Sequence, residues 1–360
     1  ISGTAAGFKK TFTEDFTATT YEDTTSTTAF WDTTNGQVTF NTTTEGELSH
    51  LGNYSTPKAR NVAVSGNYAY VADESLGVKV VDISDPTSPV YKTTIVVNPA
   101  INVTISGDYL YIPTCTDGLY VFDISNPLMP QQKAHYQGSS VDAYYDVAIS
   151  GNYAYVANDE NGLDILDISD IANGNISYVS SLNASTTYGT STGIAVSGNY
   201  AYLADGPAGM RIIDISDPTN PTTTATFDTY NAQKIAISGD YAYIADHAGG
   251  LVIVDISSST NPIEAGAWGA PEGHAAMDVA VLGDFAFVAN YGGGVYVVNI
   301  ADPTNIFQKA RYDTSGSAVG IAVPGDIYVA DYSNGLEIFR LRVSDTVQST
   351  IVDDIPDPET

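Results

Sequence analysis

Histidine, cysteine and base-assisted serine carry most metal and nucleophilic chemistry in proteins, and in this chain they are few and widely spaced. The four histidines are His50, His135, His247 and His274, and none has the H-x-H or H-E-x-x-H spacing of a metal site. The chain has neither a G-x-S-x-G nucleophile elbow nor a phosphate-binding glycine loop. Its single cysteine, Cys115, excludes an internal disulfide and a cysteine-based metal cage. The sequence therefore predicts no catalytic residue and no enzyme activity.

Carboxylates are the one chemistry-bearing group in excess, since Asp and Glu total 42 against 13 Lys and Arg, a net charge of -29. Such a chain repels phosphate groups, so we expect neither nucleic acid nor an anionic membrane surface as a partner. Oxygen-rich loops suit Ca²⁺, but no loop here has the D-x-D-x-D-G spacing of a calcium loop. We therefore predict no cofactor and keep Ca²⁺ as the alternative to a solvated acidic surface. The candidate metal ligands are Asp73, Asp159, Glu160, Asp205 and Asp246.

A twelve-residue segment recurs along the chain and indicates which elements would position these residues. Residues 62–73, VAVSGNYAYVAD, return at 147–158 as VAISGNYAYVAN. Further copies, one of them weaker and one shortened, begin at Val103, Ile194, Ile235, Val279 and Ile321. The turn glycines of the seven copies, from Gly66 to Gly325, follow one another at intervals of 41 to 47 residues by subtraction. A period in this range is the signature of a repeat architecture.

Each repeat has the pattern of four β-strands. Alternating apolar residues and a Ser-Gly-Asn or Ser-Gly-Asp turn predict a hairpin into the Tyr-Ala-Tyr-Val strand. A glycine-containing loop leads to the third strand, and an Asp-Pro turn separates that strand from a more polar fourth one. Four antiparallel strands make one propeller blade, so the sequence predicts an all-β, seven-bladed β-propeller of four-stranded antiparallel blades. The acids expected to cap the Asp-Pro turns are Asp82, Asp123, Asp167, Asp214 and Asp255.

The ring is predicted to close without a covalent link. The seventh repeat has its first three strands between residues 320 and 341 and lacks a good fourth. Residues 48–54, ahead of the first repeat, resemble a fourth strand without a blade of its own. We therefore expect this segment to complete the last blade. In such a ring His247 and His274 share one face, either as loop histidines or as a transition-metal pair that would need Asp246 or Glu272.

The third strand of the fifth repeat, residues 251–255, has the sequence LVIVD, and variants of it stand at 78–82, 119–123, 163–167 and 210–214. Because the motif recurs in register with the Ser-Gly and Asp-Pro turns, the chain resembles the LVIVD-repeat family over residues 48 to about 341. It departs from the motif at Asn299 and Arg340. The resemblance implies a propeller on the outside of bacterial or archaeal cells and no particular chemistry.

Three regions differ in composition. Residues 1–47 form a Thr-rich N-terminal extension, 48–343 the seven-bladed propeller, and 344–360 an acidic C-terminal tail. In the extension, 29–32 and 38–40 flank an Asn-Gly pair and predict a β-hairpin. Its aromatic side chains either pack on the propeller rim or add a strand to a neighbouring subunit. The candidate assembly residues are Phe8, Phe12, Phe16, Phe30, Trp31 and Phe40.

Export is the expected fate of the chain. No apolar run approaches the ~20 residues of a membrane helix, and the single cysteine favours a prokaryotic exterior. Five sequons supply candidate glycosylation sites, at Asn41, Asn53, Asn102, Asn175 and Asn183. We therefore expect an extracellular, cell-surface structural protein that assembles with itself into a filament or surface array. The alternative is a ligand- or Ca²⁺-binding adhesion or recognition module on the cell surface.

Overall fold

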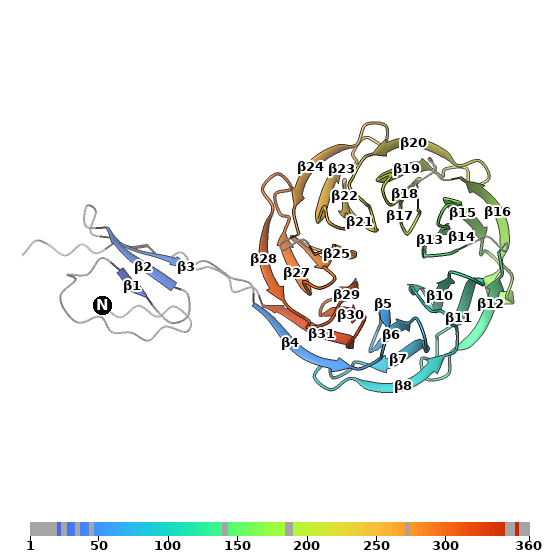
Figure 1. Ribbon diagram of the computed structural model, residues 1–360, viewed down its shortest axis with the longest axis horizontal. Coiled ribbons are helices and arrows are strands. Elements are labelled where there is room, and N and C mark those ends of the chain that lie inside the picture. The colour runs from blue at the N-terminus through green and yellow to red at the C-terminus, as the bar shows by residue number, and fades with distance from the viewer. Residues whose placement is uncertain are drawn as a thin grey trace, which may run out of the picture. The chain divides into compact units, whose positions relative to one another are not determined.

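The computed structural model describes residues 20–22, 27–32, 37–42, 47–138, 143–183, 190–270, 274–342 and 350–352. The chain divides into two compact units, Leu48–Leu341 and a second one built from strands of the two chain ends. The first unit is a ring of seven four-stranded antiparallel sheets (Figure 1). The predicted all-β, seven-bladed propeller is therefore confirmed. Within the described residues the one helical element is the 3₁₀ turn η1 (Ile171–Asn173).

The blades follow one another in chain order, each with its first strand innermost and its fourth at the rim (Figure 1). Blade 1 contains β5 (Ala59–Ser65), β6 (Tyr68–Asp73), β7 (Gly77–Asp82) and β8 (Val90–Ile95). Blade 2 contains β9 (Thr104–Ser106), β10 (Tyr109–Thr114), β11 (Gly118–Asp123) and β12 (Gln131–Tyr136). Blade 3 contains β13 (Asp146–Ser150), β14 (Tyr153–Ala157), β15 (Leu163–Asp167) and β16 (Ser177–Leu182).

The remaining blades repeat this plan. Blade 4 contains β17 (Gly193–Ser197), β18 (Tyr200–Ala204), β19 (Met210–Asp214) and β20 (Thr222–Phe227). Blade 5 contains β21 (Lys234–Ser238), β22 (Tyr241–Ala245), β23 (Leu251–Asp255) and β24 (Ile263–Trp268). Blade 6 contains β25 (Asp278–Leu282), β26 (Phe285–Ala289), β27 (Val295–Asn299) and β28 (Phe307–Tyr312). Blade 7 contains β29 (Ala318–Ala322), β30 (Ile327–Asp331), β31 (Gly335–Arg342) and β4 (Glu47–Tyr54).

Each pair of neighbouring blades shares one apolar cluster, and the seven clusters together form the core. The second strands dominate this packing because their inner aromatic residue points to the next blade while small residues point back. Tyr155 of β14, for example, packs with Ala201 and Leu203 of β18. The cluster of Tyr328 in blade 7 with Ala69 in blade 1 closes the ring. Burial of each such aromatic side chain contributes about 1.5–3 kcal/mol.

Closure uses the strand that precedes the first repeat. β4 is the hydrogen-bonded neighbour of β31 at the outer edge of blade 7, so the predicted closure is confirmed. Leu48 is buried in the cluster between blades 6 and 7. His50 lies 2.6 Å from Glu337 of β31, Nε2 to Oε2, and its ring stacks on Tyr312 at a centroid distance of 5.8 Å. Gly52 is required because a Cβ there would lie 2.6 Å from the carbonyl oxygen of Pro86 in blade 1.

The Asp-Pro turns are capped as predicted. The acid that ends each third strand accepts a hydrogen bond from the backbone N–H two residues later, at 2.8 to 2.9 Å. The residue two positions later is a serine in all five blades, and its hydroxyl and backbone N–H together hold the pKa of each carboxyl below its ordinary value, the hydroxyl having the larger effect in four of the five. In blade 6, where Asn299 replaces the acid, its amide oxygen accepts from Ala301 at 3.2 Å. The exception to the motif at this position therefore keeps the same local structure.

The second unit contains a four-stranded sheet made from both ends of the chain. Its order is β1 (Thr20–Glu22), β2 (Thr27–Asp32), β3 (Gln37–Thr42) and β32 (Thr350–Val352). β2 and β3 pair antiparallel with Trp31 opposite Val38, which is the predicted hairpin. Phe30 and Trp31 therefore lie on β2 and Phe40 on β3, whereas Phe8, Phe12 and Phe16 lie outside the described residues.

Truncation tests the role of β4 in closure. A chain that starts at residue 47 keeps all seven blades, and we expect it to melt as the propeller of the full chain does. A chain that starts at residue 55 loses β4 and leaves the edge of β31 and the contacts of Leu48 uncovered. We expect it to lose at least about 3 kcal/mol of stability, or to aggregate. Thermal melting followed by circular dichroism compares the two chains, and equal melting temperatures would contradict closure by β4.

Candidate functional site

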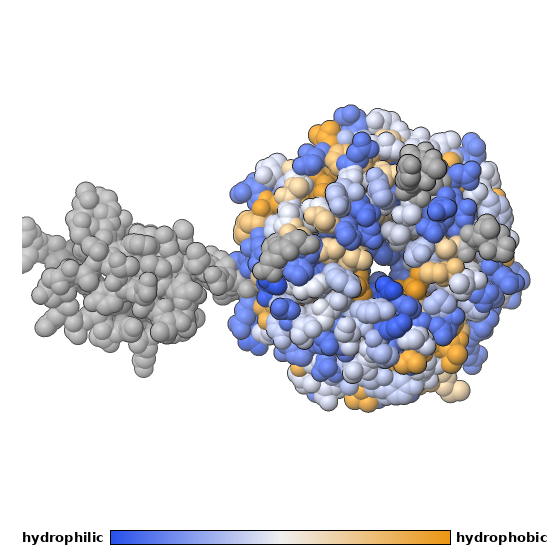
Figure 2. Space-filling model, viewed as in Figure 1, coloured by the Kyte–Doolittle hydropathy of each residue, from blue (hydrophilic) through white to orange (hydrophobic). Residues whose placement is uncertain are grey.

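One position in each repeat changes its chemistry from blade to blade while the residues around it stay similar. It follows the buried polar residue that ends each second strand, and it opens the loop to the third strand. We call these seven residues the mouth ring: Glu74, Cys115, Asp159, Gly206, His247, Tyr291 and Tyr332. Figure 2 shows the opening at the centre of the propeller, with both hydrophilic and hydrophobic residues around it.

The backbone of the mouth ring is tied to the entrances of the innermost strands. Asp159, Gly206, His247 and Tyr291 each form a β-bridge with a residue at or just ahead of the start of the next blade's first strand. The partner N–H and C=O groups of Asp159 and Ser191 lie 2.9 and 3.2 Å apart, for example. Asp159, His247 and Tyr291 adopt φ values of 40°, 46° and 25°, in the region that favours glycine. The bridges hold these three residues in a backbone conformation that is strained for residues other than glycine.

Blades 7 and 1 give the mouth a positive side. The Arg60 guanidinium lies 2.5 Å from the Glu74 carboxylate, and its Cζ lies 4.7 Å from the centre of the Tyr332 ring. Lys58 approaches the same carboxylate at 3.4 Å. Burial acts to raise the pKa of Glu74, but Arg60 and Lys58 hold it below its ordinary value. One carboxylate thus meets two cations, which leaves one net positive charge among these three groups.

Blades 2 and 3 give it an acidic, aromatic side. Burial raises the pKa of the Cys115 thiol, which hydrogen-bonds with the Tyr145 hydroxyl. Burial, followed by Cys115 and Asp159, raises the pKa of Tyr145 to about 12. Burial and the neighbouring Glu160 raise the pKa of Asp159. A thiol with a raised pKa is a poor nucleophile, so this cluster suits recognition of a polar group rather than covalent catalysis.

Below the mouth, one position near the start of each first strand forms a second ring. We call it the inner ring: Asn61, Asn102, Asp146, Gly193, Lys234, Asp278 and Gly320. Asp146 accepts from the Asn102 amide at 2.7 Å and pairs with the Lys234 ammonium at 2.7 Å. Gly193 lets the two chains approach closely, because a Cβ there would lie 2.5 Å from the carbonyl oxygen of Gln233 and 3.2 Å from Cδ of Lys234. Asp146 also accepts from the Ile194 N–H at 3.1 Å. The inner ring therefore joins blades 2 to 5 by polar contacts.

Asp278 makes the equivalent link between blades 6 and 7. Its carboxylate accepts from the Val279 N–H at 2.8 Å and from the Ile321 N–H at 2.9 Å. Gly320 stands beside it, as Gly193 stands beside Asp146. Burial raises the pKa of Asp278 to about 6, against the opposing effects of Lys234 and of the two N–H groups. Asp278 is therefore the inner-ring group that titrates near physiological pH.

The five predicted metal ligands are spread over four blades, and three of them are engaged in structural contacts. Asp73 accepts hydrogen bonds from the Thr56 hydroxyl and from the Ser75 N–H. Asp205 forms a buried ion pair with Arg211 at 2.8 Å. Asp246 accepts from the backbone N–H groups of residues 230 and 231 at 2.9 and 2.6 Å. Asp159 and Glu160 adjoin each other at the mouth. Among the described residues no three acidic, histidine or cysteine side chains are grouped as a metal site requires.

The histidines have separate roles. His247 forms a β-bridge with Ala276, and Ala276 follows His274 by two positions in the sequence. The two histidines therefore belong to neighbouring segments of one face, as predicted. Asp246 turns both oxygens to backbone N–H groups, and Glu272 lies outside the described residues. The geometry therefore supports two loop histidines. His50 pairs with Glu337 as described above, and His135 stacks on Tyr120 with the ring centroids 3.9 Å apart.

The sequons differ in accessibility. Asn53, Asn175 and Asn183 are exposed, and Asn41 lies on β3 with its side chain outside the described set. Asn102 is buried, and its amide donates to the Tyr145 carbonyl at 3.1 Å as well as to Asp146. A glycan on this nitrogen would break the inner ring. The expectation that Asn102 is a glycosylation site is therefore corrected by its burial.

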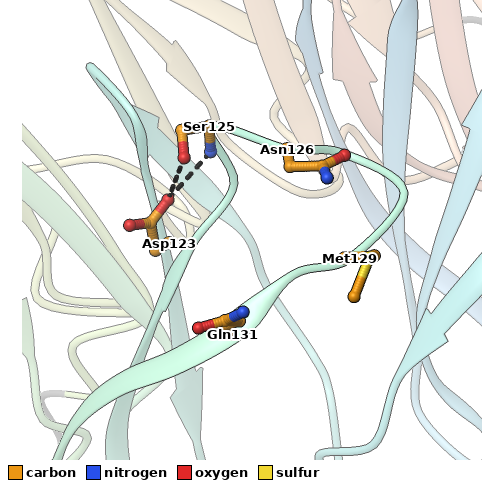
Figure 3. A pocket seen from close by; sticks show the side chains of 5 residues that line it. All are labelled: Asp123, Ser125, Asn126, Met129 and Gln131. Carbon is orange, nitrogen blue, oxygen red and sulfur yellow. Dashed lines mark hydrogen bonds between the residues drawn. The ribbon is translucent and has the colours of Figure 1, made fainter.

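A small hollow of about 170 Å³ lies at the Asp-Pro-type turn of blade 2 (Figure 3). Met129 and Gln131 flank it, and the Asp123 carboxylate faces Ser125, from which it accepts hydrogen bonds at 2.9 and 2.6 Å. That carboxylate is the turn cap of its blade, so the hollow lies beside a structural turn.

The described part of the chain also contains no helix with the length and hydropathy needed to span a membrane.

Sequence reasoning missed several groups that act at or near the rings, namely Arg60, Tyr145, Lys234 and Arg211. The first three lie outside the motifs described above, and Arg211 lies within the LVIVD variant at 210–214. Each acts with partners 6 to 88 residues away by subtraction of the residue numbers. The signal that finds them is the comparison of the seven repeats position by position. At the inner-ring position, for example, four blades carry a neutral residue and three carry a charge, and each charged side chain has a partner in a nearby blade.

Comparison with known proteins gives a family and a fold. A family model described as LVIVD repeat matches seven times, at residues 57–96, 99–137, 144–181, 188–229, 231–268, 273–314 and 315–339. No curated protein matches the sequence. The structure titled "Structure of U3-55K" is similar, with a TM-score of 0.65 and 11% identity over 82% of this chain and 98% of that one. The computationally designed Ika8 protein is similar with a TM-score of 0.57 and 12% identity over 89% and 94% of the two chains. At such identities the likeness shows the fold alone.

The titration of Asp278 predicts a pH effect on stability. The folded pKa, about 6, exceeds the ordinary value near 4, so between these pH values the folded chain holds a proton that the unfolded chain has lost. Stability contributed by this group therefore falls as pH rises from about 4 to about 6, by on the order of 2 kcal/mol. We expect Asp278→Asn to remove this fall, while Asp240→Asn, at an exposed turn, keeps it. Denaturant unfolding across pH 4–7 measures the effect, and parallel curves for Asp278→Asn and the parent chain would contradict it.

Chelation tests the calcium alternative. Because Asp73, Asp205 and Asp246 already accept protein N–H or O–H donors or pair with Arg211, we expect EDTA to change the melting temperature by less than about 1 °C. An ion bound only to the folded chain would stabilise it, so its removal would lower the melting temperature. A drop of several degrees that added Ca²⁺ reverses would return these carboxylates to the role of metal ligands.

Proposed function

We propose that this chain, which belongs to the LVIVD repeat family, is an extracellular structural protein that assembles with copies of itself, as a filament or surface array, through its terminal extensions. The observation that carries the proposal is the second unit, in which strands from both chain ends form a sheet of their own. The propeller closes with β4, so it requires none of the residues that precede residue 47. The extensions therefore have no evident duty inside the ring.

The composition of the N-terminal extension supports a contact between copies. It carries Phe8, Phe12, Phe16, Phe30, Trp31 and Phe40, which are costly to leave in water. Burial of one such side chain contributes about 1.5–3 kcal/mol, so several together outweigh part of the entropy cost of ordering the segment. A strand added to a sheet edge supplies directional hydrogen bonds as well. A head-to-tail contact of this kind builds a filament unless its rotation closes.

The location outside the cell rests on chemistry that suits an exposed surface. The chain has one cysteine and a net charge of -29, and three of its sequons, at Asn53, Asn175 and Asn183, have exposed asparagines. Charge of this size keeps separate copies from clumping through their propellers, because like charges repel. Assembly is then left to the Thr-rich and aromatic segments of the extension.

A second candidate function, recognition of a ligand at the cell surface, is favoured by the mouth ring. Arg60 and Lys58 on one side and Asp159 and Glu160 on the other would suit a polar ligand that carries both charge signs. Assembly and recognition use different parts of the chain. Removal of the extension therefore separates them, because a recognition module keeps its mouth ring when residues 1–45 are deleted.

Deletion of residues 1–45 tests the assembly function. The truncated chain retains β4 and every blade, so we expect a folded propeller with an unchanged circular dichroism spectrum. It should no longer form the filaments or arrays that the full chain forms, as seen by negative-stain electron microscopy and sedimentation velocity. Unchanged assembly of the truncated chain, or a full-length chain that stays monomeric at high concentration, would rule the proposal out.

A further inference from the structure

We propose that, in the assembled protein, β32 of one copy pairs with β3 of the next copy, so that exchanged C-terminal strands join the copies. This inference rests on the proposed self-assembly and names the strands that carry it. The partner is a second copy of this chain, and the surface is one edge of a described sheet. The exchange forms no covalent bond and needs no co-reactant.

The register shows how little holds β32 in its own sheet. β32 is a three-residue strand at the edge, and it pairs with Gln37, Val38 and Thr39 of β3. β3 continues to Thr42, and the remaining half of its edge has no paired strand among the described residues. Short edge strands of this kind contribute few ladder hydrogen bonds. Their loss from one copy costs little, and an incoming strand can replace all of them.

Pairing between copies repeats the pairing within one copy. The same residues of β3 would meet the same residues of β32, so the hydrogen bonds formed equal those released. The choice between the two forms then depends on the local concentration of strands rather than on new contacts. At the cell surface, where copies lie close together, exchange is favoured over the closed form.

The propeller permits the exchange because it is closed independently. β4 completes blade 7, so withdrawal of β32 leaves all seven apolar clusters intact. Seven residues, 343–349, separate β31 from β32 along the chain, and four residues, 43–46, separate β3 from β4. An extended run of seven residues reaches about 24 Å. The C-terminal strand can therefore reach a neighbouring sheet while the propellers stay apart.

Charge favours this mode of contact over contact between propeller faces. Each copy carries a net charge of -29, so propellers pressed together would repel. Strands β1, β2, β3 and β32 contain two charged residues, Glu22 and Asp32, and neither lies on the β3–β32 pair. The joint between copies is thus the part of the described chain ends where charge interferes least.

The test uses the opposed pair Thr39 and Thr350. Two single variants, Thr39→Cys and Thr350→Cys, are made in a Cys115→Ser full chain with tags of different mass, mixed, assembled and oxidised. Directly opposed residues of antiparallel strands are close enough for a disulfide. Neither variant can form the 39–350 disulfide within one chain, so a disulfide-linked heterodimer on a non-reducing gel, with the 39–350 linkage confirmed by mass spectrometry, is the expected result.

Two further variants complete the experiment. The double variant Thr39→Cys/Thr350→Cys should give a ladder of linked copies when assembled, and a compact linked monomer when dilute. The hairpin pair Thr27→Cys/Thr42→Cys is the matched control, because those residues are opposed within β2 and β3 and should link inside one chain under both conditions. Assembled protein whose 39–350 disulfides are all within single chains overturns strand exchange while leaving self-assembly standing. A full chain that does not assemble overturns both proposals.

Discussion

A four-stranded blade has two apolar faces and covers neither by itself, and this constraint organises the propeller. Each face is covered by the next blade, with an aromatic residue such as Tyr155 set against small residues such as Ala201. The solution repeats only if the ring closes, since a first and a last blade would each leave one face in water. β4 meets that requirement by completing blade 7, where Tyr328 packs with Ala69 of blade 1. The closed propeller therefore needs no residue outside 47–342.

The polar groups divide into those that every blade repeats and those that one blade alone possesses. The turn caps, such as Asp82 and Asp255, recur because each blade needs the same turn. The inner ring is different, since its charged residues occur in single blades. Asp146 pairs with Lys234 and accepts from the Asn102 amide, and Gly193 leaves room beside Lys234. The mouth ring varies most of all, with seven positions and six residue types. In a repeat protein, residues that vary in this way at one face can form a binding site without changing the packing of the apolar core.

The repeats, the turns and the closing strand could be predicted from the sequence because their signals are local. Ser-Gly and Asp-Pro turns punctuate each repeat, and 48–54 resembles a fourth strand that lacks a blade. The rings could not be predicted, because the pairing of Asp146 with Lys234 spans two blades and depends on the absence of a side chain at Gly193. For the same reason Asn102 reads as a sequon in sequence while its amide is buried against Asp146. The hydrogen-bond donors to Asp73 and Asp246 come from link residues that no motif identifies, and the partner of Asp205 is Arg211 on β19.

We propose that the propeller is a self-sufficient body and that the terminal sheet is the joint between copies. Electron cryo-microscopy of the assembled full-length protein tests this proposal most directly. We expect separate seven-bladed rings, with a small four-stranded sheet between each ring and the next. Rings packed face to face or edge to edge, with the terminal sheets projecting freely into solvent, would contradict it.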